Sequence, residues 1–174
     1  AYEIKECDWS SDVCSSDLNG QTLAYSLPLR ISMDFVSHAK TVFDTEIDAL
    51  RQTRARLDAS FVSAVQTITG TLLNQGKLIV TGVGKSGNLA HKIAATFTST
   101  GTTSVVLDAV NALHGDLGIV RDGDVVLALS YSGATEELLR ILPALKRFDV
   151  KIIAITGFPK SPIARHSDVV LRSE

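Results

Sequence analysis

Cysteine is nearly absent from this sequence. Among 174 residues only Cys7 and Cys14 are cysteine, and both lie within the first eighteen residues. The rest of the chain therefore has no disulfide framework and no thiolate ligand for a metal, as expected in a reducing compartment such as the cytoplasm. The histidines offer no substitute. His91, His114 and His166 do not show the spacing of metal ligands, so we expect no metal site.

An excess of charge of one sign and long apolar runs are also missing. The net charge is −2 at pH 7, which argues against a nucleic acid or a membrane surface as a partner. The longest apolar runs have the length of a strand and fall short of the roughly 20 residues that a membrane-spanning helix needs. Aromatic residues make up 6% of the chain and hydrophobic residues 45%, so we expect the aliphatic core of a single α/β enzyme domain.

The first eighteen residues differ in composition from the rest of the chain. Residues 8–18 are rich in serine and aspartate and look like the in-frame translation of a sequencing-library adapter, so we interpret residues 1–18 as a non-native leader. A native, disordered Ser/Asp-rich leader is the alternative. Residues 19–32 are a further leader segment, which we assign neither to the non-native part nor to the native part of the chain. Met33, the only methionine, is our candidate for the natural start because it opens a helical pattern.

Two patterns of apolar residues divide the remainder of the chain. Apolar side chains recur every three or four residues up to about Asn74, which predicts two amphipathic helices, with Asp58 as the N-cap of the second. From Gly76 onward, short Val/Ile/Leu runs alternate with helical segments. The predicted fold class is therefore α/β, a three-layer αβα sandwich with a mainly parallel five-stranded sheet, preceded by two helices. The expected strands are residues 78–83, 104–107, 125–129, 152–156 and 169–171, and the expected helices are residues 33–57, 59–74, 88–98, 136–148 and 162–166.

The segment from Ser130 to Glu137 is the most informative about function. It follows the apolar run at 125–129 and precedes a helix-forming segment, so hydroxyl side chains and the amides of a helix N-terminus meet at one place. Such a loop can bind phosphate, and the carboxylate of Glu137 lies within one turn of it as a potential base. The alternative is an ordinary helix start, in which Ser132 or Thr135 is the N-cap.

The turn at residues 82–87 is a second candidate phosphate loop. It satisfies G-x-G-x-x-G after a strand and before a helix, and with Asp108 near the end of the next strand it is compatible with a dinucleotide site. Lys85 inside the turn and the long spacing to Asp108 argue against that ligand. A P-loop is excluded because Ile79 stands where that motif needs glycine. A tight turn without a ligand is the remaining alternative.

His114 is the third candidate. Its segment, residues 113–118, reads Leu-His-Gly-Asp-Leu-Gly and is not expected to form a regular helix or strand. We therefore place His114 on a loop near the strand ends, where it could move a proton or bind a sugar hydroxyl. A local structural hydrogen bond is the alternative role for a single histidine.

Together these motifs resemble the sugar isomerase (SIS) domain, and within it the arabinose-5-phosphate isomerases, which interconvert arabinose 5-phosphate and ribulose 5-phosphate. The resemblance covers residues 76–174 and is carried by residues 82–87, 92–97, 99–102, 114–118, 130–133 and 145–147. It implies aldose–ketose isomerisation of a sugar phosphate through an enediol, without a cofactor. The residues implied for the phosphate are Ser86, Ser130, Ser132 and Thr135. The residues implied for catalysis are Lys85 for charge stabilisation, His114 for ring opening or proton relay, and Glu137 for moving the proton between carbons.

The sequence departs from the family pattern at two positions and at its end. Asn88 stands where the family usually has histidine, and Asn111 where an acidic residue is common, which bears on the identity of the sugar phosphate. The family has a second acidic residue, a further histidine and paired C-terminal modules beyond the position of Glu174. We therefore expect the SIS domain at 76–174 to be incomplete at its C-terminus.

The resemblance also implies a homodimer or homotetramer, for which the apolar faces of the helices in residues 33–75 are suited. Two functions of other classes stay open at this point. One is a non-catalytic sensor of sugar phosphates built on the same fold, although such a sensor would have no use for Glu137 and His114. The other is a dinucleotide-binding domain.

Overall fold

The computed structural model describes residues 34–173, so the predictions for residues 1–33 lie outside the described residues. The chain divides into two units, residues 1–39 and 40–174. The sheet, the helices that cover it and every candidate site residue belong to the second unit.

Helices α1 (Phe35–Ala55) and α2 (Ala59–Leu73) confirm the two helices predicted before the sheet. Asp58 is the N-cap of α2, as predicted, and its carboxylate accepts hydrogen bonds from the hydroxyl and the amide of Ser60. These two bonds hold the pKa of the Asp58 carboxyl below its usual value. The cap therefore stabilises the folded state above the ordinary pKa of aspartate and loses this effect as the pH falls through the lowered value. No helix among residues 34–173 is both long and apolar enough to cross a membrane.

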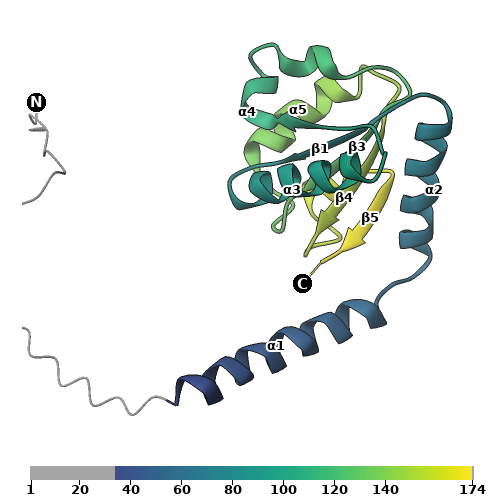
Figure 1. Ribbon diagram of the computed structural model, residues 1–174. Coiled ribbons are helices and arrows are strands. Elements are labelled where there is room, and N and C mark those ends of the chain that lie inside the picture. The colour runs from purple at the N-terminus through teal and green to yellow at the C-terminus, as the bar shows by residue number, and fades with distance from the viewer. Residues whose placement is uncertain (1–33, 174) are drawn as a thin grey trace, which may run out of the picture. The chain divides into compact units, whose positions relative to one another are not determined.

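Five parallel strands form one sheet in the order β2-β1-β3-β4-β5, which confirms the predicted fold class. The strands are β1 (Leu78–Gly82), β2 (Ser104–Asp108), β3 (Val125–Leu129), β4 (Lys151–Thr156) and β5 (Val169–Arg172). The helices after the first strand are α3 (Lys85–Ser99), α4 (Ala109–Ala112), a 3-10 helix (Asp116–Ile119), α5 (Glu136–Leu145) and α6 (Pro162–Arg165). Figure 1 shows the elements with these labels.

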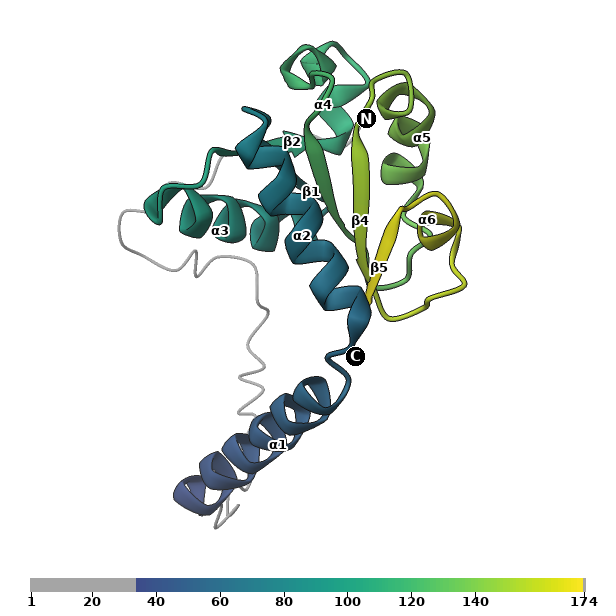
Figure 2. The ribbon, with the colours of Figure 1, turned by 90° about the vertical axis from the view of Figure 1, so that its right-hand side faces the viewer.

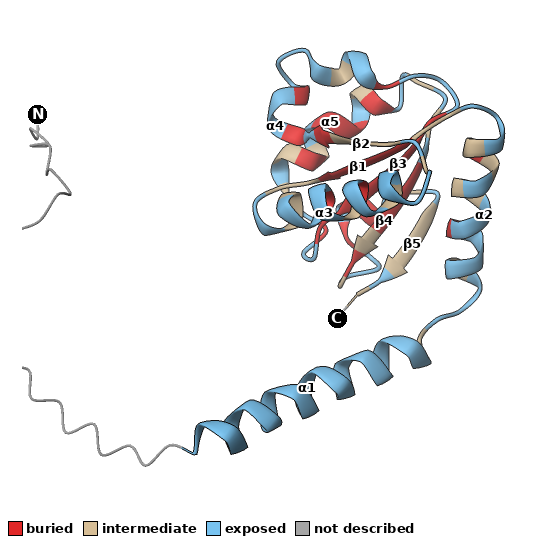
Figure 3. Ribbon diagram, in the orientation of Figure 1, coloured by how far each residue is buried: buried red, intermediate tan, exposed pale blue. Residues whose placement is uncertain are grey.

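Successive residues of the central strands are buried on opposite faces of the sheet. On one face Leu78 and Val80 pack with Ala90 of α3 and Ala64 of α2. On the other face Ile79 belongs to the cluster formed with the buried side chains of α5. Figure 2 shows α2 and α3 on one side of the sheet and α5 and α6 on the other, and Figure 3 shows that the middle strands are buried. Burial on both faces explains why these strands read as continuous apolar runs rather than as alternating patterns.

Helix α3 begins earlier than predicted, at Lys85 instead of Asn88. The prediction treats Gly87 as a turn residue, but Gly87 lies in the first turn of the helix. A Cβ at that position would come 3.1 Å from the carbonyl oxygen of Gly82. The helix packs closely on the end of β1, which favours glycine at this position. The turn itself is made by Gly84, whose φ of +59° lies in the left-handed region.

The segment after β2 also differs from the prediction. The sequence pattern excludes regular structure between Leu113 and Gly118, but residues 116–119 form the short 3-10 helix. His114 itself lies in the turn between α4 and that helix, as predicted. Helix α5 ends at Leu145, before the predicted residue 148.

Candidate functional site

The two candidate phosphate loops lie at the same edge of the sheet. The parallel register pairs Gly82 at the end of β1 with Leu129 at the end of β3, so the segments that follow these strands begin side by side. The strand order reverses between β1 and β3, because the chain passes from β1 to β2 on one side and returns to β3 on the other. In open α/β sheets, ligands bind beyond the carboxyl ends of the strands at such a switch point. The topology thus places both loops where this class of fold binds its ligands.

The loop from Ser130 to Thr135 is folded around its own hydroxyl groups. Ser130 is 2% exposed, and its hydroxyl oxygen accepts a hydrogen bond from the amide of Gly133 at 3.0 Å. The same hydroxyl shares a hydrogen bond of 2.8 Å with the hydroxyl of Thr135. The hydroxyl of Ser132 accepts a bond from the amide of Ala134 at 3.3 Å, and Ser132 stays exposed. Ser130 therefore orders the loop from inside, whereas Ser132 lies at its surface.

Helix α5 has one of the two N-cap residues of the alternative interpretation, Thr135, directly before its first residue, but it has no capping hydrogen bond from either side chain. Thr135 occupies the N-cap position of α5, but its side chain makes no capping hydrogen bond because its hydroxyl pairs with Ser130. The hydroxyl of Ser132 bonds to Ala134, which precedes the helix. The first-turn amides of α5 are therefore not capped by either side chain, and they can donate to an anion.

The two carboxylates in the first turn of α5 have different surroundings. Glu136 is exposed and forms an ion pair with Arg140 one turn later. Glu137 is half-buried and forms no ion pair with any residue that the structure describes. Of the two, Glu137 is the carboxylate whose oxygens are not already engaged by a cation.

Lys85 and Ser86 lie in the first turn of α3, which starts from the end of the neighbouring strand β1. Lys85 is exposed and Ser86 is half-buried. The N-cap residue, Gly84, has no side chain that could satisfy the helix amides. Two helix N-termini, those of α3 and α5, thus begin at adjacent strand ends, and both favour negative charge.

No hydrogen bond or ion pair joins His114 to Lys85 or Glu137 within the part of the chain that the structure describes. His114 is exposed, and its side chain makes no hydrogen bond with the described part of the chain, so a local structural bond is not found either. Asp108, the acid of the dinucleotide interpretation, is the N-cap of α4. Its carboxylate accepts hydrogen bonds from the amides of Val110 and Asn111 at 2.8 and 2.9 Å, which engages the acid in a structural role.

Two cavities flank the loops. One, of about 280 Å³, lies at the Gly-rich turn and is lined by Gly82, Val83, Gly84, Gly87, Asn88, His91, Asp108, Ala109 and Val110. The other, of about 700 Å³, is lined by Ser132, Gly157, Phe158, Pro159, Lys160, Ser161, Pro162 and Arg172. Lys85, His114 and Glu137 line neither of them. Asn88, which departs from the family pattern, lies in the first cavity and is thus placed to affect which ligand fits there.

Comparison with known proteins identifies the family. Residues 71–174 match the family model described as the SIS domain. This chain belongs to the SIS domain family. It is 41% identical over 140 residues to arabinose 5-phosphate isomerase KdsD of Pseudomonas aeruginosa, an alignment that covers 80% of this chain and 42% of the relative. The chain thus spans less than half the length of that curated relative, and the resemblance inferred from the motifs is confirmed.

Solved structures show the same SIS fold. A phosphosugar isomerase assigned to capsule formation in Bacteroides fragilis superimposes with a TM-score of 0.75 at 35% identity, covering 79% of this chain and 72% of the other. An Escherichia coli CFT073 protein solved in complex with arabinose 5-phosphate gives a TM-score of 0.74 at 36% identity, covering 80% and 72%. Both superpositions confirm the fold of this SIS domain.

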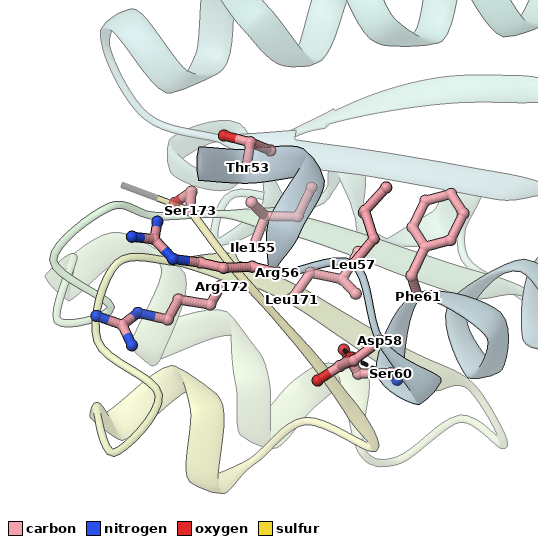
Figure 4. A pocket seen from close by; sticks show the side chains of 10 residues that line it. All are labelled: Thr53, Arg56, Leu57, Asp58, Ser60, Phe61, Ile155, Leu171, Arg172 and Ser173. Atoms are coloured by element: carbon pink, nitrogen blue, oxygen red, sulfur yellow. Dashed lines mark hydrogen bonds between the residues drawn. The ribbon is translucent and has the colours of Figure 1, made fainter. Parts of the chain in front are cut away.

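A third cavity, of about 240 Å³, is lined by the last turn of α1, the start of α2 and the ends of β4 and β5 (Figure 4). In Figure 4 the side chains of Arg56 and Arg172 extend in the same direction, whereas Asp58 is bonded to Ser60. None of the predicted site residues of the SIS domain lines this cavity. We therefore do not include it in the candidate site.

The sequence prediction missed the residues that contact the Ser130–Thr135 loop from the end of β4 and the segment after it. Thr156, the last residue of β4, is fully buried and donates a hydrogen bond of 3.1 Å to the carbonyl oxygen of Tyr131. The Tyr131 ring lies edge-on to Phe158, with 5.7 Å between centroids. The signal that could have revealed Thr156 is a polar residue that ends an apolar strand, directly before a glycine.

Proposed function

We propose that this SIS domain binds a sugar phosphate and isomerises it between aldose and ketose, with arabinose 5-phosphate and ribulose 5-phosphate as the substrate pair. The observation that supports this most is that two helix N-termini without a side-chain cap, one with Lys85 and the other with Glu137, follow the adjacent strands β1 and β3 at the switch point. The identity to arabinose 5-phosphate isomerases supports the choice of sugar.

In this proposal the phosphate lies between the starts of α3 and α5. Ser86, Ser132 and Thr135 contribute hydroxyl groups, together with the uncapped amides of the two helices. Ser130, which is buried, keeps the loop in the shape that holds the phosphate. The phosphate is the handle that positions the sugar, because its charge is favoured by both helix dipoles.

The chemistry requires a proton to move between neighbouring carbons. In the open-chain aldose, Glu137 removes the proton from C2, and the C–H electron pair forms the C1=C2 bond of an enediolate while the aldehyde oxygen becomes negatively charged. Lys85 stabilises that charge. Glu137 then returns the proton to C1, while the proton of the C2 hydroxyl moves to the charged oxygen on C1, so that C2 becomes the carbonyl carbon of the ketose. His114 serves ring opening or proton relay in this scheme.

The reaction can be followed by proton NMR in D₂O with arabinose 5-phosphate and the protein as its gene encodes it. We expect ribulose 5-phosphate to appear with deuterium at C1, because the proton held by the base exchanges with solvent. If the protein binds the sugar phosphate without isomerising it, the isomerase proposal is wrong and the sensor function is favoured. If it neither binds nor turns over this sugar, the substrate assignment is wrong.

We also infer that the protein assembles as a homodimer or homotetramer. Phe61, Val62, Val65 and Leu73 of α2 are between 45% and 78% exposed, although they are apolar. An apolar stripe of this kind is typical of an interface. Light scattering should give two or four copies per particle. Val62→Glu should shift the assembly toward monomer, whereas Ser63→Glu, on another side of the helix, should not. A wild-type monomer would contradict the inference.

A further inference from the structure

The carbonyl groups of the Ser130–Thr135 loop are held by the segment that follows β4. The carbonyl oxygen of Tyr131 accepts hydrogen bonds from the amide of Gly157 at 2.9 Å and from the hydroxyl of Thr156 at 3.1 Å. The carbonyl oxygen of Gly133 accepts one from the amide of Ile163 at 3.0 Å. The loop is therefore anchored on the side of β4, through its backbone rather than through its side chains.

The hydrogen bonds to the Tyr131 carbonyl also fix the direction of the amide N–H of Ser132. No peptide bond of the described residues is cis, so the carbonyl of Tyr131 and the N–H of Ser132 point in opposite directions within one planar unit. Because the carbonyl points toward Thr156 and Gly157, the N–H of Ser132 points away from these two residues. Strand β1 lies on the side of β3 that is opposite to β4. This is the side where α3 begins with Lys85.

The Thr156 hydroxyl has two partners in a fully buried position. Thr156 is 0% exposed, and its hydroxyl donates to Tyr131 while accepting a hydrogen bond from the amide of Phe158 at 3.2 Å. One hydroxyl thus joins the candidate phosphate loop to the start of the β4–α6 connection. Valine has nearly the same shape but can neither donate nor accept, so the two backbone groups would lose this partner.

The strand ladder leads directly into this contact. The amide of Ser130 donates to the carbonyl oxygen of Ile155 at 3.1 Å, which continues the pairing of β3 with β4 by one bond. The next residue of β4 is Thr156. Its side-chain hydroxyl forms a hydrogen bond to the loop just beyond the last pair of the regular ladder. The position of the loop is thus set by the last residues of β4, up to and including this hydroxyl.

We propose that Thr156 is a positioning residue for the phosphate site. Its hydroxyl holds the Tyr131 carbonyl and thereby aims the Ser132 amide at the anion. The inference rests on the proposed function, in which this loop binds the phosphate of the substrate. Thr156 touches no substrate itself and acts through the backbone of the loop.

The test compares Thr156→Val with Thr156→Ser in the protein as its gene encodes it. For Thr156→Val we expect the KM for arabinose 5-phosphate and the Kd for inorganic phosphate to rise about 3- to 10-fold, the effect of one misdirected hydrogen bond, with kcat changed much less. Thr156→Ser retains the hydroxyl and should bind both ligands like the wild type. Should the valine variant not fold, Thr156→Ala, which only removes atoms, replaces it in the same comparison.

A direct readout of the geometry is the ¹H–¹⁵N resonance of Ser132. We expect it to shift in Thr156→Val and not in Thr156→Ser, and to respond to inorganic phosphate in the wild type and the serine variant. Wild-type phosphate affinity and an unshifted Ser132 resonance in Thr156→Val would overturn the role of Thr156 while leaving the proposed function intact. A wild-type protein that binds neither phosphate nor sugar phosphate would instead refute the proposed function, and this role with it.

Discussion

Replacing Glu137 by glutamine should lower kcat for arabinose 5-phosphate by about 10²- to 10⁴-fold, the usual contribution of a general base. Glutamine has nearly the same size and shape as glutamate, but its neutral amide cannot accept the proton from C2. The binding of the sugar phosphate should stay within about twofold of the wild type, because the hydroxyls and amides that hold the phosphate are untouched. Calorimetry and NMR turnover in D₂O measure the two quantities separately.

The adjacent carboxylate is a matched control for this variant. Glu136 lies in the same turn of α5 but is exposed and paired with Arg140. Since an exposed pair of this kind contributes at most about 0.5 kcal/mol, Glu136→Gln should leave kcat and stability nearly unchanged. Equal losses of binding and turnover in Glu137→Gln would show that Glu137 holds the substrate instead of moving its proton. A wild-type kcat would place the base elsewhere.

Replacing Gly133 by alanine should damage both the loop and the fold. Gly133 is buried with a φ of +62°, and a Cβ there would overlap Oγ and Cβ of Ser161 and come 2.8 Å from Oγ1 of Thr156. Both neighbours are buried, so the loop has to move outward. The left-handed backbone and the overpacking together should lower the free energy of unfolding by about 2–4 kcal/mol. Thermal unfolding should show this as a Tm lower by roughly 5–15 °C.

The same change should weaken the phosphate site. Moving Gly133 outward breaks its carbonyl contact with the amide of Ile163 and its amide contact with Ser130. We therefore expect the Kd for inorganic phosphate to rise by at least about tenfold, the effect of losing one or two hydrogen bonds that order the site.

The control for Gly133→Ala is Gly70→Ala, in the interior of α2. A Cβ at Gly70 would meet nothing within 4 Å, so alanine should raise the free energy of unfolding by about 0.5–1 kcal/mol and leave phosphate binding unchanged. If Gly133→Ala matches the wild type in both Tm and phosphate affinity, the loop is not packed as tightly on Ser161 as the structure indicates.

The boundaries of the strands show what the sequence predicts well. Residues 125–129 form β3 as predicted, and the other strands agree to within one residue at each end. The central strands β1, β3 and β4 are mostly buried, and each strand carries a run of apolar residues that local inspection detects. The helix boundary at Lys85 is predicted less well, because the glycine at position 87 serves the close approach to Gly82, a contact that lies outside any local pattern.

The residues of the candidate site also divide into those that local sequence patterns predict and those that they do not. The sequence predicts the hydroxyl-rich loop, its carboxylate and Lys85 as site residues because their residue types and their places after strands are local features. Thr156 is not found in this way. Its partner Tyr131 lies 25 residues earlier in the chain, and nothing in either local pattern indicates that they meet.

By itself, the sequence determines the alternation of strands and helices, the three-layer architecture and the kinds of residue that follow β1 and β3. Only the tertiary structure decides that these two strands lie side by side, that Thr135 bonds to Ser130 instead of capping α5, and that the end of β4 anchors the loop. The physical reason is that any two Val/Ile-rich strands can pair equally well by local composition. The order β2-β1-β3-β4-β5 follows from burying both faces of the whole sheet at once, and that is a property of the assembled chain.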